Sequence, residues 1–373
     1  MEKGIIVGVN TSKNDKIFLN ELKELTSLCE ACNIEIVEEV TQNLDEQNIK
    51  SYIGKGKLEE LKIAINATDA DVIICNDELS PAQISNLQDI LGILVFDRTY
   101  VILEIFKRRA KTREAILQVD IASLKYMLPR LSGLRSGFSR QRGAGGMAHG
   151  KGKGETQLEI DRRNISSRIS LLKKELSDLT NNRQVQRKKR KENNFKTVCL
   201  VGYTNSGKST TLNRLLQYSK EIKKEVFEKD MLFATLETST RKIKLENNFQ
   251  FLVTDTVGFV NKLPHDLVEA FKSTLEEINE CDLILHVVDS SNENFDNQIE
   301  TTNSVLESIG VKDIPILYVF NKIDKIDGYF YIPPQYENAI RISSKADINI
   351  NNLLKMIKKL YMPLLVAMVA VLT

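Results

Sequence analysis

Cysteine and histidine are scarce in this sequence, which has five cysteines and three histidines in 373 residues. So few cysteines, in an odd number, argue against a disulfide-stapled domain and fit the reducing cytoplasm. Cys29 and Cys32 form a CxxC pair, but no second pair or nearby histidine accompanies them. We interpret them as buried residues at a helix end, with a redox or metal site as the alternative. No histidine lies in a pattern that indicates a general base, and His286, inside LILHVVD, is interpreted as a packed strand residue.

Long apolar runs are also absent. The run GIIVGV near the N-terminus is too short for the apolar region of a signal peptide. Leu360–Thr373 carries no charge over 14 residues, whereas a spanning helix needs about 17–25 apolar residues. Pro363 also interrupts this tail, which we place at 361–373. We expect a strand or helix packed on the body or on a partner, with a membrane-surface anchor as the alternative, and no stable membrane insertion.

The first block, over residues 1–110, alternates apolar runs with helical patterns. The runs GIIVGV, IEIVEEV, DVIICND and ILVFD are separated by helical patterns around Leu19–Cys32, Leu58–Ala67 and Pro81–Leu91. Strands separated by helices predict a small parallel α/β domain.

The second block, over residues 111–194, contains two apolar seams with the spacing 4, 3, 4, 3. One seam runs from Leu117 to Leu131 and the other from Ile165 to Leu179. Two such seams predict an antiparallel coiled-coil helical hairpin. Pro129 should end the first helix near Leu128, and the second should begin near Thr156. The glycine-rich segment 132–155 is then the basic tip of the hairpin. Arg187–Lys191 is interpreted as a solvated linker, with a nucleic-acid contact as the alternative.

The third block, over residues 195–360, has the rhythm of a doubly wound α/β domain. The predicted strands are Thr197–Val201, Phe249–Asp255, Leu283–Asp289, Ile314–Phe320 and Ala339–Ile342. The predicted fold class is therefore α/β throughout, with a parallel N-terminal domain, a helical hairpin and a doubly wound domain.

The first predicted strand of this domain leads into the motif G-x-x-x-x-G-K-S, and a helical pattern follows it. This is the context of a phosphate-binding P-loop, in which glycines let backbone N–H groups surround phosphate oxygens at a helix N-terminus. The lysine can reach the β and γ phosphates and the serine can coordinate Mg²⁺. The predicted nucleotide-binding residues are Gly202, Tyr203, Thr204, Asn205, Ser206, Gly207, Lys208, Ser209 and Thr210.

A second motif, D-x-x-G, lies 47 residues after the P-loop lysine, at a strand end. Its members, also predicted to contact the nucleotide, are Asp255, Thr256, Val257 and Gly258. The aspartate can hold Mg²⁺ through water and the glycine N–H can sense the γ-phosphate. Loss of that phosphate releases the following loop, which makes the motif a switch.

A third motif, N-K-x-D, specifies the base. A carboxylate accepts both the N1–H and the 2-amino hydrogens of guanine, whereas adenine leaves it unpaired. The motif therefore predicts GTP and GDP as ligands and argues against a P-loop ATPase or kinase. The predicted base-site residues are Asn321, Lys322 and Asp324 with Ser343, Ser344 and Lys345 of the following ISSK run.

Hydrolysis needs groups at the γ-phosphate. Thr235 is the predicted switch threonine and a metal ligand beside Ser209 and Asp255, with Thr238 and Thr240 as competitors. We assign catalytic roles to Thr235, Gly258, Asn205 and Lys208.

Phe259 follows Gly258 where many small GTPases have a water-orienting glutamine, so we expect slow intrinsic hydrolysis. An asparagine in the P-loop binds a monovalent cation in some GTPases, so Asn205 suggests stimulation by potassium.

Taken together, these residues resemble the HflX family of ribosome-associated GTPases. The resemblance extends over roughly Tyr52 to Ile350 and includes YIGKGKLEEL, NDELSPAQISNLQ, SRQRGAGG, GETQLEIDRR, FATLETSTR and DTVGFVNKLPHDLVEAFKSTLEE. It implies GTP hydrolysis stimulated by ribosomes, binding of the 50S subunit and, in some members, splitting or rescue of stalled or idle ribosomes.

The run KGKGE departs from the family's pattern because Lys153 replaces the usual proline. Many members also have a further C-terminal domain, and some hydrolyse ATP through the N-terminal region, where we find no ATP motif.

The resemblance suggests that the glycine-rich segment 132–155 binds ribosomal RNA. From Ile121 to Gly154 there are seven lysines or arginines and no acid, and basic contacts to ribosomal RNA release counterions. Flexible basic segments can order on RNA. The predicted RNA-binding residues are Arg135, Arg140, Arg142, Lys151 and Lys153. We predict a monomeric GTPase switch acting on the 50S subunit; the alternative is a GTP-sensing scaffold with a protein partner, the basic tip being a passive linker.

Overall fold

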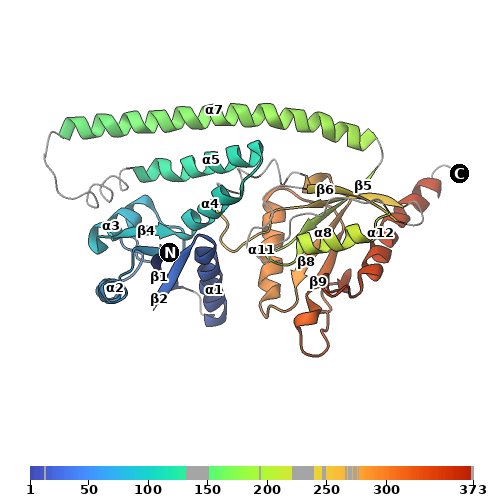
Figure 1. The fold of residues 1–373 in the computed structure, drawn as a ribbon, viewed down its shortest axis with the longest axis horizontal. Coiled ribbons are helices and arrows are strands. Elements are labelled where there is room, and N and C mark those ends of the chain that lie inside the picture. Colours follow the sequence, from blue (N-terminus) through green and yellow to red (C-terminus); the bar gives the residue numbers. More distant parts are fainter. Residues whose placement is uncertain are drawn as a thin grey trace. The chain divides into compact units, whose positions relative to one another are not determined.

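The computed structural model describes residues 1–11, 14–131, 151–192, 195–220, 239–245, 249–264, 267, 271, 275 and 277–370. Within these ranges, the side chains of residues 151–157, 180–192 and 362–370 are not described. The chain forms two compact units (Figure 1). The first comprises Met1–Asn182 with Lys262–Phe271, and the second comprises Arg183–Asn261 with Lys272–Thr373. The short segment after the D-x-x-G motif thus belongs to the first unit.

The first unit contains a four-stranded parallel sheet with the strand order β2-β1-β3-β4. Its strands are β1 (Glu2–Asn10), β2 (Ile34–Asn43), β3 (Val72–Cys75) and β4 (Leu94–Asp97). The helices between them are α1 (Asp15–Ala31), α2 (Lys55–Thr68) and α3 (Pro81–Leu91). Strands and helices alternate as the apolar runs predicted, so the small parallel α/β domain is confirmed.

Cys29 and Cys32 lie at the end of α1 and are buried and free. Burial raises the pKa of both thiols, that of Cys32 to about 11. Such thiols are poor nucleophiles and metal ligands at neutral pH. The interpretation as packed helix-end residues is confirmed.

A further helix, α4 (Arg98–Arg109), follows β4 directly and was not predicted. The Asp97 carboxylate caps it by accepting a hydrogen bond from the Tyr100 N–H at 2.9 Å. Arg98, 1% exposed, pairs with Glu24 of α1 at 2.6 Å and with the Asn76 side chain at 3.1 Å. The ion pair therefore anchors α4 to α1, in addition to the burial of its apolar side chains.

The hairpin consists of α5 (Arg113–Met127), the single turn η1 (Leu128–Arg130) and α7 (Lys151–Glu192). The two predicted seams pack on each other, with Leu117, Ile121, Ile169 and Leu172 buried between the helices. Figure 1 shows α5 and the first part of α7 side by side and antiparallel. A bidentate Arg113–Glu175 pair, with distances of 2.7 and 2.8 Å, also joins the two helices. The predicted helical hairpin is confirmed.

Both ends of α7 differ from the prediction. The helix begins at Lys151 rather than near Thr156, so Gly152 and Gly154 are helical. Glycine costs a helix about 1 kcal/mol relative to alanine, but extending an existing helix is far easier than nucleating one. The helix also continues through Arg187–Lys191, which we had interpreted as a linker, because arginine and lysine are good helix formers.

The segment Lys262–Phe271 is held to the first unit by charge and by packing. The Lys262 ammonium lies 2.6 Å from Glu21 Oε2 and 2.7 Å from Asp77 Oδ1. The Phe271 ring meets the Phe106 ring of α4 edge to face, with centroids 5.2 Å apart. The sequence did not predict that this stretch leaves the GTPase unit.

The second unit contains a six-stranded sheet with the order β10-β9-β8-β5-β7-β6. Its strands are β5 (Lys196–Val201), β6 (Ser239–Lys244), β7 (Gln250–Asp255), β8 (Leu283–Asp289), β9 (Ile316–Asn321) and β10 (Ala339–Arg341). Five of these strands were predicted and are parallel, whereas β6 was missed and pairs antiparallel with β7. The doubly wound fold is confirmed, with an antiparallel edge strand.

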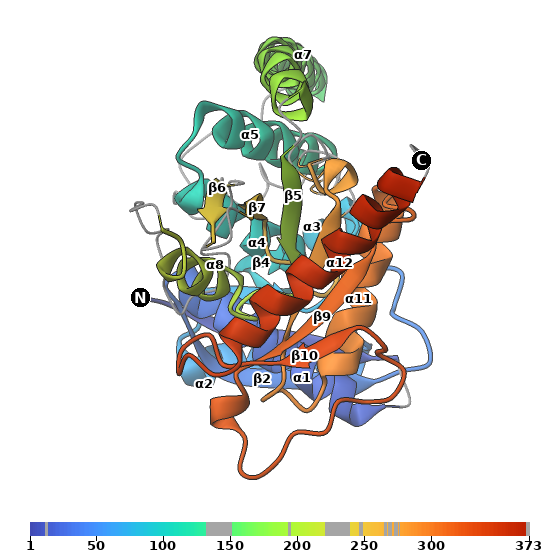
Figure 2. The same ribbon diagram turned by 90° about the vertical axis from the view of Figure 1, so that its right-hand side faces the viewer.

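The helices of this unit include α8 (Lys208–Gln217), α11 (Phe295–Ser308) and α12 (Ile350–Ala370). Figure 2 shows α12 crossing the sheet, where Leu353, Ile357 and Tyr361 join its core. The predicted break at Pro363 is wrong, because the helix continues to Ala370. Packing of the preceding turns offsets the roughly 3 kcal/mol that an interior proline costs. Among the described residues, no helix combines the length and apolarity needed to cross a bilayer.

Candidate guanine-nucleotide site

The P-loop joins the end of β5 to the start of α8. Gly202 and Gly207 have φ angles of +144° and +96°, which only glycine adopts without strain. A Cβ on Gly202 would lie 2.2 Å from the Val287 carbonyl oxygen, and one on Gly207 would lie 2.3 Å from Asn321 Nδ2. The two glycines of the motif are therefore required by backbone conformation and by space.

Lys208 lies at the first turn of α8, inside the loop. Its ammonium donates to the carbonyl oxygens of Gly202 and Tyr203 at 3.0 and 2.8 Å. Burial lowers the pKa of Lys208 to about 8, while the Asp255 carboxylate opposes this shift. A buried ammonium held by backbone carbonyls faces the interior of the loop, where phosphates bind. The Ser206 hydroxyl is also buried and lacks a hydrogen-bond partner, which fits a polar cradle.

Ser209 and Asp255 fit a magnesium site. The Ser209 hydroxyl donates to Asp255 Oδ2 at 2.7 Å, which brings the hydroxyl and carboxylate of two motifs together. Mg²⁺ commonly takes one or two such protein ligands together with phosphate and water oxygens. Accordingly, no group of three acidic, histidine or cysteine side chains is needed, and none occurs among the described residues.

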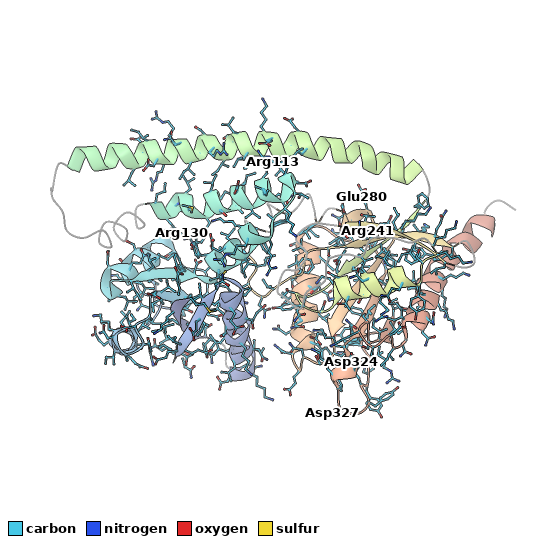
Figure 3. All side chains as sticks on the ribbon, in the orientation of Figure 1. Arg113, Arg130, Arg241, Glu280, Asp324 and Asp327 are labelled. Atoms are coloured by element: carbon cyan, nitrogen blue, oxygen red, sulfur yellow. The ribbon has the colours of Figure 1, made fainter. Side chains whose placement is uncertain are left out.

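The base-recognition loops are tied to the P-loop. The Asn321 amide donates to the Ser206 carbonyl at 3.0 Å and accepts from the Ser344 N–H at 3.0 Å. The Ser343 hydroxyl donates to Asp324 Oδ1 at 2.5 Å. Asp324 follows β9 in the short turn η3 (Ile323–Lys325), at the lower edge of the unit in Figure 3. The protein thus holds one carboxylate oxygen, and both oxygens still have lone pairs to accept the two hydrogen bonds from guanine.

Three residues that sequence reasoning missed support these loops. Asp289, at the end of β8, lies 2.8 Å from the Lys322 ammonium. Arg214 of α8 donates to the carbonyl oxygens of Ser344 and Lys345 at 2.8 and 2.9 Å. The Thr211 and Ser344 hydroxyls are 2.8 Å apart. Only Asp289 had a signal in the sequence, since carboxyl ends of parallel strands gather at one edge of a sheet.

The D-x-x-G motif lies against the P-loop. The Thr256 hydroxyl donates to the Leu200 carbonyl at 2.7 Å, which ties the motif to β5. Phe259 is 1% exposed, so its side chain faces the core rather than a lytic water. His286 of β8 is 1% exposed, and burial and the Lys208 charge lower its pKa to about 3. Its interpretation as a packed, neutral strand residue is confirmed.

Several predicted residues lie outside the described part of the chain. They are Thr235, Thr238, Arg135, Arg140 and Arg142, while Lys151 and Lys153 are described only as backbone of α7. Thr240 is described and lies in β6, where its hydroxyl is 3.0 Å from that of Thr254. Thr240, the alternative to Thr235 as switch threonine, is therefore held in the sheet by its contact with Thr254. Asn205 is exposed at the P-loop, with a φ of +58°.

Comparison with known proteins decides the family. Residues 20–107 match the family of GTP-binding GTPase N-terminal regions, residues 109–190 the GTP-binding GTPase middle region, and residues 197–322 the 50S ribosome-binding GTPases. The GTPase HflX of Caldanaerobacter subterraneus is 44% identical over 358 residues, covering 96% of this chain and 80% of that protein. The chain belongs to the HflX family of GTPases.

Other HflX proteins and a solved structure are also similar. The GTPase HflX of Escherichia coli is 39% identical over 83% of this chain and 71% of that protein. A GTP-binding protein of Sulfolobus solfataricus, solved with GDP, is 27% identical, with a TM-score of 0.46 over 98% of this chain and 100% of that one. As an HflX GTPase, the protein binds GTP and GDP and hydrolyses GTP, and it is ribosome-associated.

Proposed function

We propose that this GTPase is a monomeric, cytoplasmic switch that docks on the 50S subunit in its GTP form and splits or rescues stalled or idle ribosomes. The α5–α7 hairpin carries the proposal, because an apolar seam and the Arg113–Glu175 pair join its two helices. The segment 132–150, which joins its helices, holds Arg135, Arg140 and Arg142. A hairpin whose two helices are joined by a basic segment suits a contact with ribosomal RNA.

The chemistry at the site follows from its residues. Lys208 and the P-loop amides would bind the β and γ phosphates, and Ser209 and Asp255, with Thr235, would hold Mg²⁺. The metal would neutralise charge that develops on the phosphates. Phe259 cannot orient water, so turnover by the free protein should be slow and the ribosome should stimulate it.

The direct test is co-sedimentation of the protein with 50S subunits in a non-hydrolysable GTP analogue, in GDP and without nucleotide. We expect binding with the analogue only. Replacing Arg135, Arg140 and Arg142 with glutamate should abolish it while leaving GTP binding intact. If each arginine contacts one phosphate, single alanine variants should each reduce the salt dependence of log K by about 1.

A matched control separates an RNA contact from a general charge effect. Lys355, Lys358 and Lys359 lie on α12 in the other unit, and their reversal to glutamate changes the charge equally. This control should still co-sediment. Equal binding to 50S subunits in all three nucleotide states would contradict a GTP-dependent switch. Loss of co-sedimentation in both triple variants would contradict a specific contact of the tip.

A potassium effect is expected from Asn205. Asn205 is exposed in the P-loop, and an amide oxygen beside bound phosphates could hold a monovalent cation that adds positive charge there. We expect GTP turnover several-fold faster in KCl than in NaCl, and the difference should vanish in Asn205→Ala. Equal rates for the unmodified protein in the two salts would remove the idea.

A further inference from the structure

The residues that follow Asp255 form a backbone clasp on the P-loop. The Phe259 N–H donates to the Gly202 carbonyl at 3.2 Å, and the Thr204 N–H donates to the Phe259 carbonyl at 2.7 Å. Tyr203 and Phe259 thus form a parallel bridge. Phe259 and Val260 are buried, at 1% and 0% exposed. We call Gly258–Asn261 the latch segment.

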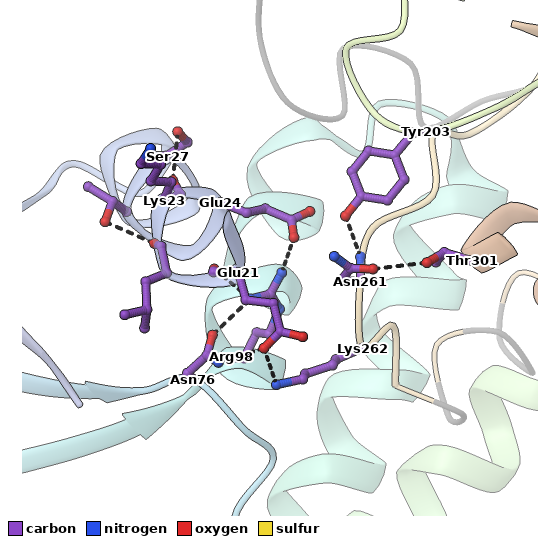
Figure 4. A network of polar contacts seen from close by, with 12 residues as sticks. Glu21, Lys23, Glu24, Ser27, Asn76, Arg98, Tyr203, Asn261, Lys262 and Thr301 are labelled. Carbon is purple, nitrogen blue, oxygen red and sulfur yellow. Dashed lines mark hydrogen bonds and ion pairs between the residues drawn. The ribbon is translucent and has the colours of Figure 1, made fainter. Parts of the chain in front are cut away.

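The tyrosine of the P-loop holds the far end of the latch segment. The Tyr203 hydroxyl accepts a hydrogen bond from the Asn261 N–H at 2.7 Å (Figure 4). The Thr301 hydroxyl of α11 donates to Asn261 Oδ1 at 2.9 Å. Tyr203 is 6% exposed, so this bond lies largely out of water. The latch segment is therefore fixed at Phe259 by backbone bonds and at Asn261 by two side chains.

In this conformation Gly258 lies directly on the loop. A Cβ on Gly258 would lie 2.8 Å from Thr204 Cα and 3.0 Å from the Lys208 ammonium. A γ-phosphate bound by both Lys208 and the Gly258 N–H must lie between them, and each hydrogen bond alone spans about 2.7–3.2 Å between heavy atoms. Little space therefore separates Gly258 from the Lys208 ammonium in this conformation, and a γ-phosphate can enter between them only if the latch segment or Lys208 moves.

We propose that Tyr203 is a positioning residue that sets the preference of the site between GDP and GTP. Its hydroxyl stabilises the latch segment in the closed position, so the γ-phosphate must break the Tyr203–Asn261 bond as it binds. A ligand shifts such an equilibrium by its differential affinity for the two states, and weakening the closed state favours the ligand that needs the open one.

The test is Tyr203→Phe, which removes one oxygen and keeps the ring. Titration should show an affinity for a non-hydrolysable GTP analogue about 3- to 10-fold higher than that of the unmodified protein, the range expected for one hydrogen bond. The affinity for GDP should stay within about 2-fold. In steady state, KM for GTP should fall more than kcat changes.

Tyr361→Phe is the matched control, because it removes a buried hydroxyl that donates to the Thr197 carbonyl at 3.1 Å in the same unit. It should leave the GTP-to-GDP preference unchanged. Thr301→Val removes the bond to the Asn261 side chain, together with a bond to the Asn297 carbonyl within α11; it should shift the preference in the same direction by less. It also provides the measurement if Tyr203→Phe does not fold. Equal shifts for both nucleotides, or none in a folded variant, would overturn the proposal.

Discussion

Asp324→Asn should weaken GTP binding by about 100- to 10,000-fold and make the site accept xanthosine triphosphate. Guanine gives two hydrogen bonds to this carboxylate, and bonds to a charged group contribute about 1.5–3 kcal/mol each. The Ser343 hydroxyl donates to Oδ1, so it should also fix the amide of the variant with its oxygen toward Ser343. The amide nitrogen then replaces the free carboxylate oxygen and faces the base.

This geometry decides which base is accepted. The amide nitrogen repels the 2-amino group of guanine and donates to the C2 oxygen of xanthine. Direct calorimetric titration with each nucleotide measures both affinities. Asp327→Asn is the matched control, since Asp327 lies in the same loop and is exposed (Figure 3); it should keep the affinity for GTP. Unchanged GTP affinity in Asp324→Asn would show that another residue recognises the base.

The sequence predicted the fold where local signals were strong. The 4, 3, 4, 3 seams gave the hairpin, and apolar runs gave five strands of the second sheet. The strand β6 was missed because STRKIK buries only Ile243 fully and has no apolar run. The continuation past Pro363 was missed because it depends on packing of Leu353 and Ile357 against the sheet.

The site was predictable as motifs but not as a connected structure. Glycine and lysine spacing identified the P-loop, because phosphate binding demands those residues locally. The bond between Asn321 and the Ser206 carbonyl joins residues 115 apart, and the support of the ISSK loop by Arg214 joins residues 130 apart. Such contacts follow from how the strands are ordered in the sheet, and no local pattern encodes them. The latch bond from Tyr203 to Asn261 is of the same kind.

We expect Gly207→Ala to weaken nucleotide binding strongly, because Asn321 joins the P-loop to the base-recognition loop. The substitution places a Cβ 2.3 Å from Asn321 Nδ2 at a φ of +96°. The left-handed conformation costs about 1–2 kcal/mol, and displacing Asn321 leaves its buried partners on Ser206 and Ser344 unpaired, at about 1–3 kcal/mol each. We expect GTP and GDP to bind at least about 100-fold more weakly, because the phosphate and base loops are disturbed together.

Gly328→Ala isolates the backbone cost, because Gly328 has a φ of +98° and no atom within 4 Å of an added Cβ. It should lower the melting temperature slightly and leave nucleotide affinity unchanged. In Asn321→Ala the obstructing amide is absent. Adding Gly207→Ala to this variant should then lower nucleotide affinity only by the cost of the left-handed backbone conformation. This double-mutant cycle should show a large coupling energy. Additive losses would mean that Gly207 is required for its backbone conformation alone and that the two loops act independently.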